Sequence, residues 1–279
     1  MTHKEYRWKT KDHLHLYGQA WKPETAPKAV VNYVHGFGSH SNRAEFLFKE
    51  LVKHNIAIVT LDYRGHGKSS GKRGYVKKYD DLLSDIKVLI QHSKKIFPKT
   101  PVFLYGHSLG GNLAINYILQ KKHTVNGVIA ASPWIKLTYP PGKIKILSAK
   151  IISKIFPRII LNANINPNIL SRDNTIPKHY MHDELVHNRM SPKLYFQIEK
   201  GGNYLLVNKH KINIPILLMH GNKDKLTSHK ATKYMAKNTG RNTIIKIWKN
   251  NYHELHNELN KKEVIDYVVK WIDNNLQDS

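Results

Sequence analysis

The 279-residue sequence contains no cysteine. Disulfide bonds, thiolate nucleophiles and cysteine-ligated metal centres are therefore excluded. No segment approaches the run of roughly 18 apolar residues that a membrane-spanning helix needs, and the N-terminal stretch lacks the apolar core of a secretory signal. We therefore expect a cytoplasmic protein whose only form of membrane contact is attachment to the surface.

Acidic residues are scarce as well. The chain has 20 Asp and Glu against 45 Lys and Arg, which gives a formal net charge of +25. Such a charge favours anionic partners, including phospholipid surfaces, nucleic acid and acidic proteins, without choosing among them. A genome-wide bias toward Asn, Ile and Lys explains the same excess equally well, so we expect no specific nucleic-acid partner.

Short apolar runs alternate with helical patterns along most of the chain. This alternation predicts one α/β domain with a mostly parallel sheet covered by helices on both faces. An antiparallel hairpin, 6–8 with 13–21, is expected at one edge. The other expected strands are 29–35, 56–61, 102–105, 125–131, 214–219 and 243–248. The expected helices are 44–54, 79–97, 109–120, 229–237 and 261–274.

One segment interrupts this alternation. From 137 to 202 the sequence is rich in proline and holds only short helix-like pieces, which predicts an insertion folded over the sheet. The expected organisation is therefore a core of residues 1–136, a helical lid of residues 137–202 and a second part of the core, residues 203–279.

The stretch GHSLGG places Gly106 and Gly110 two residues either side of Ser108. This is the G-x-S-x-G spacing of a nucleophile elbow, in which a sharp strand-to-helix turn exposes the serine. The flanking positions must lack bulk so that strand and helix can approach. The apolar run before the motif and the helical pattern after it favour the elbow over an incidental Gly-Ser turn, so we predict that Ser108 is a nucleophile.

An ester-cleaving serine needs hydrogen-bond donors where the carbonyl oxygen becomes negative. The backbone N–H of Leu109, at the start of a helix, is one candidate. The loop HGFGS supplies the second, because Gly36 and Gly38 allow close approach of the backbone. We predict that the N–H of Phe37 completes the oxyanion hole.

The serine also needs a base and an acid that orients it, in the chain order Ser, Asp or Glu, His. Asp224 follows the predicted strand 214–219, at the end of the sheet where catalytic groups gather. His253 and His256 follow the next strand. We predict that Asp224 is the orienting acid and His253 the base, and that His256 is a surface neighbour, with His256 as base the remaining alternative.

Histidines elsewhere raise a metal hypothesis. HELH spaces its histidines three apart and is not the zinc-protease helix H-E-x-x-H. His179, His182, Asp183 and His187 could gather ligands on one helix. Scattered solvated histidines are the favoured interpretation, because catalytic zinc needs three convergent ligands. We expect neither a metal nor an organic cofactor.

A basic amphipathic pattern lies inside the insertion. Lys143, Lys150, Lys154 and Arg158 share one helical face, with isoleucines on the other. Such a helix can lie on an anionic lipid surface, or line an acyl pocket as part of a lid, or simply pack its apolar face on the core.

Taken together, these motifs resemble the monoacylglycerol lipase and lysophospholipase branch of the α/β-hydrolases, which is often labelled serine aminopeptidase S33-like. The similarity runs over nearly the whole chain, through YVHGFGSHSNR, LDYRGHGKSSGKRGYVKKYDDLLSDI, GHSLGGNLAINY, ASPWIKL, LSRD, HDELVH, LLMHGNKDKLT and YHELHNE. The resemblance implies an eight-stranded core, a lid between strands six and seven, and hydrolysis of a single acyl ester through Ser108, Asp224 and His253. It places the oxyanion donors at Phe37 and Leu109.

We therefore expect a serine carboxylic-ester hydrolase that cleaves a monoacylglycerol-type lipid through an acyl-enzyme. A lysophospholipase or a general carboxylesterase is the alternative within this class. The alternative of another class is a catalytically idle hydrolase fold that binds anionic membrane or nucleic acid. The expected partners are a lipid ester substrate and an anionic membrane touched at its periphery by the basic lid.

Overall fold

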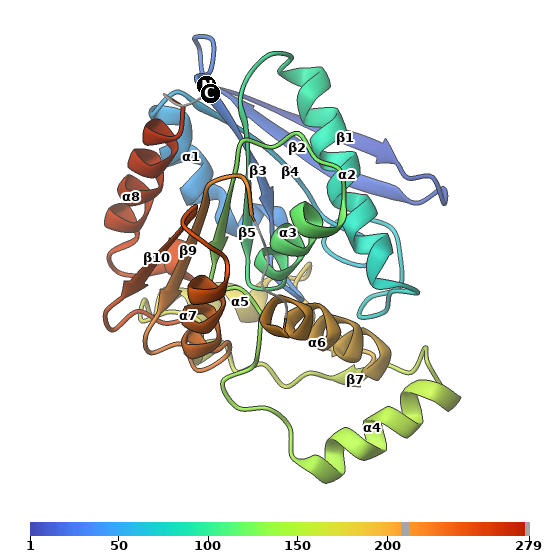
Figure 1. Ribbon diagram of the computed structural model, residues 1–279. Helices are drawn as coiled ribbons and strands as arrows, with labels where there is room; N and C mark the ends of the chain where they lie inside the picture. The colour runs from blue at the N-terminus through green and yellow to red at the C-terminus, as the bar shows by residue number, and fades with distance from the viewer. Residues whose placement is uncertain (208–211, 277–279) are drawn as a thin grey trace.

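An eight-stranded sheet organises residues 1–207 and 212–276, which the computed structural model describes (Figure 1). Its strand order is β1-β2-β4-β3-β5-β6-β9-β10. The pairs β1–β2 and β2–β4 are antiparallel, whereas the other pairs of this sheet are parallel. The strands are β1 (Thr2–Lys9), β2 (His15–Lys22), β3 (Ala29–Val34), β4 (Ile56–Leu61), β5 (Val102–His107), β6 (Gly127–Ala131), β9 (Ile216–Gly221) and β10 (Thr243–Trp248).

Helices cover both faces of the sheet. The helices that follow the strands are α1 (Glu45–Lys53), α2 (Tyr79–Ile96), α3 (Leu109–Gln120), α7 (His229–Asn238) and α8 (Lys261–Asn274). Side chains of α1 and α8 form one apolar cluster, and those of α2, α3 and α7 form another. In β3, Val30 belongs to the second cluster and Val31 to the first, as expected for a strand whose successive side chains point to opposite faces. The predicted α/β sheet covered on both sides is confirmed.

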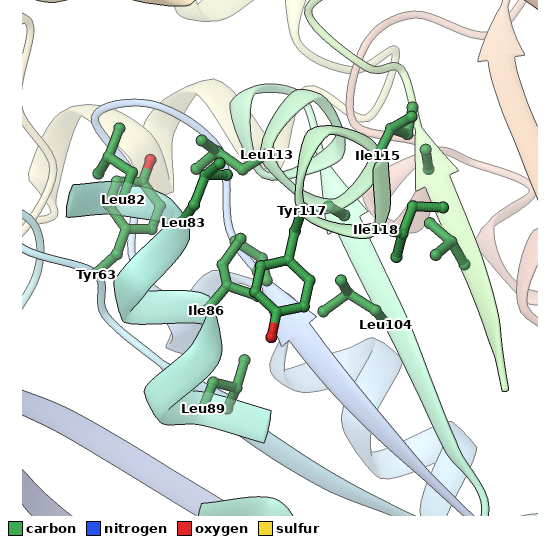
Figure 2. Packing of buried hydrophobic residues seen from close by; sticks show 14 of the residues in the cluster. Tyr63, Leu82, Leu83, Ile86, Leu89, Leu104, Leu113, Ile115, Tyr117 and Ile118 are labelled. Atoms are coloured by element: carbon green, nitrogen blue, oxygen red, sulfur yellow. The ribbon is translucent and has the colours of Figure 1, made fainter. Parts of the chain in front are cut away.

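The cluster between α2, α3 and the sheet shows why these helices form where they do. Leu82, Ile86 and Leu89 share one face of α2, at helical spacing, and they are buried. Figure 2 shows Leu83 of α2 next to Leu113 of α3, and Ile86 next to Tyr117 of α3. Removing one such side chain from water stabilises the fold by about 1.5–3 kcal/mol. This packing fixes the start of α3, which is the part of the fold that matters for the site.

A long connection joins β6, the sixth strand of the sheet in chain order, to β9, the seventh. It contains α4 (Lys143–Ile155), β7 (Leu161–Asn162), η2 (Pro167–Ile169), α5 (Thr175–His182), β8 (Arg189–Met190) and α6 (Pro192–Val207). β7 and β8 pair only with each other. Helix α4 lies apart from the sheet (Figure 1). The insertion after strand six is thus present, while the division at 136 and 202 stays a prediction; its last part, 203–279, includes two stretches outside the described residues.

Several strands differ in their bounds from the expected ones: the strand expected at 6–8 spans Thr2–Lys9, the one at 102–105 ends at His107 and the one at 125–131 begins at Gly127. The strand expected at 214–219 begins at Ile216 and ends at Gly221. It starts later because Pro215 has no N–H to donate to a ladder. It ends later because the parallel pairing with β10 continues through His220 and Gly221. This extension places His220 inside the sheet.

Among the described residues, no helix is long and apolar enough to cross a bilayer.

Helix α6 approaches the segment that follows β6 closely through a glycine. A Cβ added to Gly202 would lie 2.0 Å from the carbonyl oxygen of Ile135. We predict that Gly202→Ala lowers the free energy of unfolding by at least about 2 kcal/mol, because the backbone must move to admit the methyl group. Gly142→Ala is the control, since a Cβ there meets nothing within 4 Å; it should cost less than about 1 kcal/mol. Urea denaturation measures both, and equal losses would contradict the close contact.

Candidate active site

Ser108 stands on the turn between β5 and α3. Its φ of 55° and ψ of −117° lie in a region that L-residues rarely occupy. A Cβ on Gly106 would lie 2.2 Å from the Gly110 carbonyl, and one on Gly110 would lie 2.1 Å from the Val34 carbonyl. Both glycines are therefore required by close backbone contacts. The turn has the geometry that the G-x-S-x-G spacing predicts.

The loop after β3 lies beside this serine. A Cβ added to Gly36 would be 3.2 Å from the Cβ of Ser108. Within residues 1–207 and 212–276, neither the N–H of Phe37 nor that of Leu109 donates a hydrogen bond to another residue. Leu109 is also the first residue of α3, where unpaired amides and the helix dipole favour negative charge. Two donors are thus available next to Ser108.

Asp224 and His253 meet at the same edge of the sheet. Asp224 follows β9, His253 follows β10, and Nδ1 of His253 lies 2.7 Å from Oδ2 of Asp224. Both side chains are almost completely buried. Burial raises the pKa of the Asp224 carboxyl, but the charge and hydrogen bonds of His253 and His220 outweigh it and hold this pKa well below its usual range. The carboxylate is therefore ionised and oriented toward His253.

A cavity of about 200 Å³ connects these groups with the insertion. Ser108 and His253 both line it. Among the described residues, no hydrogen bond joins Ser108 Oγ to His253. Most of the other walls are apolar, and they include Trp134, Leu137, Ile146, Leu170 and Met190. The site can therefore take an apolar chain next to the serine.

Further groups, which the sequence motifs did not reveal, hold the loop that carries His253. Arg43, in the 3-10 helix η1 (Ser41–Ala44) that follows β3, binds both carboxylate oxygens of Glu254 at 3.0 Å. The carbonyl of Leu170 in the insertion accepts the N–H groups of His253 and Glu254, at 3.1 and 2.7 Å. Burial raises the pKa of Glu254, but the charge of Arg43 outweighs it, so this pKa lies well below its usual range. Breaking such a buried pair leaves an uncompensated charge.

Two expectations about histidines are wrong. His256 is only 2% exposed and contacts the rings of Tyr33 and His107, so it is a core residue and not a surface neighbour. The cause is the 3-10 helix η3 (Leu255–Asn257), which turns the chain inward. His187 is half-buried and not fully solvated, because its ring packs edge-on against Phe37 and its Nε2 lies 3.2 Å from the Gly65 carbonyl; its backbone N–H donates to the Gly38 carbonyl at 2.9 Å.

The residues weighed as metal ligands have other partners. Asp183 Oδ2 lies 2.7 Å from Nε2 of His40, and Nδ1 of His182 contacts the carbonyl of Lys178. Within the part of the chain that the structure describes, no group of three His, Cys, Asp or Glu side chains could hold a metal ion.

Known proteins resemble this chain over most of its length. Residues 25–260 match the family described as serine aminopeptidase, S33. The chain belongs to this family. It is a serine hydrolase with the α/β-hydrolase fold, which confirms the resemblance and the fold class inferred from the motifs.

Three similar proteins illustrate the range of this S33 family. Human monoglyceride lipase is 32% identical over 268 residues, which cover 94% of this chain and 88% of that protein. An uncharacterized abhydrolase domain-containing protein of Dictyostelium discoideum is 33% identical over 97% of this chain, which spans only 29% of that longer protein. The crystal structure of Paleococcus ferrophilus monoacylglycerol lipase has a TM-score of 0.84 at 28% identity, covering 93% of this chain and 99% of that one.

Buried neutral histidines make the stability of this hydrolase depend on pH. Burial lowers the pKa of His35, His187 and His256 to about 4. Between pH 6.5 and 4 the unfolded chain therefore binds protons that the folded chain does not, so the free energy of unfolding falls as the pH drops. Each histidine contributes a slope of up to about 1.4 kcal/mol per pH unit.

We predict that His256→Gln reduces the slope of the free energy of unfolding against pH by the contribution of one histidine, up to about 1.4 kcal/mol per pH unit. Urea denaturation from pH 7.5 to pH 4 measures it, with the same replacement at the exposed His15 as control. An unchanged slope in His256→Gln would show that this imidazole binds its proton equally well in the folded and unfolded chains, which contradicts the prediction.

Proposed function

We propose that this chain is a lipid ester hydrolase that works through a Ser-His-Asp acyl-enzyme mechanism. The observation that carries the proposal is the convergence at one cavity of Ser108 on its strained turn, the Asp224–His253 pair and two amides without acceptors. A nucleophile, a base, an orienting acid and an oxyanion site are the parts that acyl transfer requires.

The reaction has two halves. In the first, Nε2 of His253 takes the proton of Ser108 Oγ as the oxygen attacks the ester carbonyl, and the N–H groups of Phe37 and Leu109 bind the oxyanion. The ester C–O bond then breaks, and the imidazolium returns its proton to the leaving alcohol. In the second half, water loses a proton to His253 and attacks the acyl-serine, which releases the fatty acid and restores Ser108.

A monoacylglycerol-type ester is the substrate that we propose. Two observations support it: the apolar cavity beside Ser108 accepts an acyl chain, and the human and P. ferrophilus relatives carry the names monoglyceride lipase and monoacylglycerol lipase. Lysophospholipids and simple carboxylic esters are the alternatives that the same chemistry accommodates. No step of the mechanism calls for a metal or an organic cofactor.

We also propose that the insertion is a lid whose helix α4 rests on an anionic lipid surface. Ile144, Leu147, Ile151 and Ile155 form one stripe at helical spacing and are 87%, 62%, 52% and 63% exposed. No residue of α4 is buried, so packing of its apolar face on the core is wrong as an interpretation. Ile146 and Ala149 line the cavity on the other side.

The charge of α4 supports an anionic lipid surface as its partner. Lys143, Lys145, Lys150 and Lys154 flank the exposed stripe of α4, and α4 contains no acidic residue. A basic helix with an apolar stripe binds anionic lipid with its apolar side down. When α4 lies on the lipid in this way, the cavity on its inner side is close to the lipid that supplies the substrate.

The mechanism predicts that Ser108→Ala abolishes ester hydrolysis. We expect kcat for p-nitrophenyl butyrate to fall by at least about 10⁴-fold, since the nucleophile is lost, while the midpoint of thermal unfolding stays near that of the parent. A fluorophosphonate probe should label the parent at Ser108, identified by mass spectrometry of the labelled peptide.

Ser84→Ala, a change on the exposed face of α2, is the control and should keep both activity and labelling. Full turnover by Ser108→Ala would overturn the mechanism. A parent that neither hydrolyses esters nor reacts with the probe would favour the catalytically idle fold.

The lid proposal predicts a loss of vesicle binding on polar substitution of the stripe. Ile144→Ser with Leu147→Ser should weaken binding to vesicles containing phosphatidylglycerol by roughly 50-fold, because two aliphatic side chains no longer enter the lipid. Co-sedimentation measures the binding. The control pair is Tyr234→Ser with Ile244→Ser, which removes exposed apolar groups elsewhere and should bind as the parent does. Equal binding by both pairs would refute the role of α4.

A further inference from the structure

The Asp224 carboxylate accepts hydrogen bonds from more donors than the orientation of His253 alone requires. Its Oδ1 accepts from the N–H groups of Leu226 and Thr227, at 2.7 and 2.9 Å. Its Oδ2 contacts Thr227 Oγ1 at 2.9 Å, His253 Nδ1 at 2.7 Å and His220 Nε2 at 3.0 Å. The carboxylate oxygen that faces the base is therefore shared between two imidazoles.

The neighbours of His220 determine which of its nitrogens carries a hydrogen. Nε2 lies 3.0 Å from the Asp224 carboxylate, 3.1 Å from the carbonyl of Thr227 and 3.3 Å from Thr227 Oγ1, a hydroxyl that itself donates to Asp224. The carboxylate and the carbonyl are acceptors only, so Nε2 is a donor. Nδ1 lies 2.8 Å from Oγ1 of Thr232, a hydroxyl that serves as donor or acceptor. His220 therefore donates to Asp224 in either protonation state.

The position of His220 is rigid. It lies within β9, opposite Ile247 of β10, and it is 0% exposed. Its partner Thr232 belongs to α7 and is equally buried. The imidazole thus bridges β9, which lies between β6 and β10, and the covering helix α7, four residues before the carboxylate that it contacts. It does not line the cavity that holds Ser108 and His253.

From this arrangement we infer that His220 is a positioning residue for ester hydrolysis, acting on His253 through the carboxylate of Asp224. Its Nε2–H holds Oδ2 in the rotamer that receives Nδ1–H of His253 and takes up part of the negative charge. The inference rests on the proposed function. It concerns orientation and charge at the acid, since His220 touches neither substrate nor the reacting serine.

Removing this donor has a directional electrostatic consequence. With one hydrogen bond fewer, the negative charge of Asp224 is less compensated and stabilises the imidazolium form of His253 more strongly. The other groups near His253 are His107, His256 and the Glu254–Arg43 pair, and they stay in place. The acid limb of the kcat/KM profile, which reports the loss of a proton by the base in the free enzyme, should move to higher pH.

The test compares His220→Leu, which removes the donor, with His220→Gln, whose side-chain amide restores one. With p-nitrophenyl butyrate we expect kcat of His220→Leu to fall by about 10- to 100-fold, as misplaced catalytic groups do, with KM changed less than about 2-fold. His220→Gln should recover most of the loss. Thr232→Val, which removes only the partner of Nδ1, should shift kcat and the acid limb in the same direction by less.

His229→Leu is the matched control, because this neighbouring histidine on α7 contacts the ring of His220 and has no hydrogen bond to Asp224 among the described residues. It should keep the parent kcat and pH profile. Thermal unfolding of each variant separates loss of fold from loss of orientation. If His220→Leu fails to fold, Thr232→Val and His220→Gln still carry the test.

The inference is overturned if His220→Leu keeps the parent kcat and the parent acid limb. It is also overturned if His220→Gln loses as much activity as His220→Leu and the loss in each variant follows its loss of stability. Failure of the proposed function gives a different result: the parent itself would show no turnover and no fluorophosphonate labelling at Ser108. The Nδ1–H resonance of His253, followed by NMR in parent and variants, reports the Asp224–His253 hydrogen bond without any substrate.

Discussion

The turn at Ser108 is the constraint on which the rest of the site depends. The serine holds a conformation that costs on the order of 1–3 kcal/mol, and the surrounding backbone fixes it. Its N–H donates to the Ala131 carbonyl, while its own carbonyl accepts from Asn112 and Trp134. The tight contacts of Gly106 and Gly110 bring β5, α3 and β3 together at this one point. That geometry places the Ser108 side chain at the tip of the turn and leaves the N–H of Leu109 without an acceptor among the described residues.

Sheet order then brings the proposed acid and base to this turn. β5 pairs with β6, β6 with β9 and β9 with β10, all parallel, so the loops after these strands open at one edge. Asp224 and His253 come from two of these loops. The His253 loop is tied both to the insertion, through the Leu170 carbonyl, and to the loop after β3, through Arg43 and Glu254. The proposed base is thus held by the segments that form the cavity walls.

Much of this arrangement is readable from the sequence, because its strongest signals are local. A glycine spacing defines the elbow, and two successive apolar strands predict where an acid and a histidine lie. The helix 109–120 and the strand 243–248 have the bounds expected of them. The burial of His256 and the contact of His220 with Asp224 could not be predicted, since both depend on tertiary contacts that a periodic pattern does not encode. HELH gives no hint that η3 turns His256 inward, and His220 resembles any strand residue until its register with β10 is known.

The insertion is a second case in which the sequence pattern alone does not decide the structure. Its basic amphipathic pattern allowed three interpretations, and only the tertiary arrangement separates them. Ile146 and Ala149 face the cavity while Ile144 and Leu147 face outward, so α4 is apolar on two sides. No sequence periodicity distinguishes an apolar side that meets a substrate from one that meets a membrane.

The most direct test of the proposed mechanism is a crystal structure of the protein after reaction with an alkyl phosphonate ester, which mimics the tetrahedral intermediate. The proposed mechanism predicts a covalent bond from Ser108 Oγ to phosphorus. It also predicts that the phosphonyl oxygen accepts hydrogen bonds from the N–H groups of Phe37 and Leu109, and that Nε2 of His253 lies within hydrogen-bond distance of Oγ. A phosphonate attached to another residue, or an oxygen turned away from both amides, would contradict it.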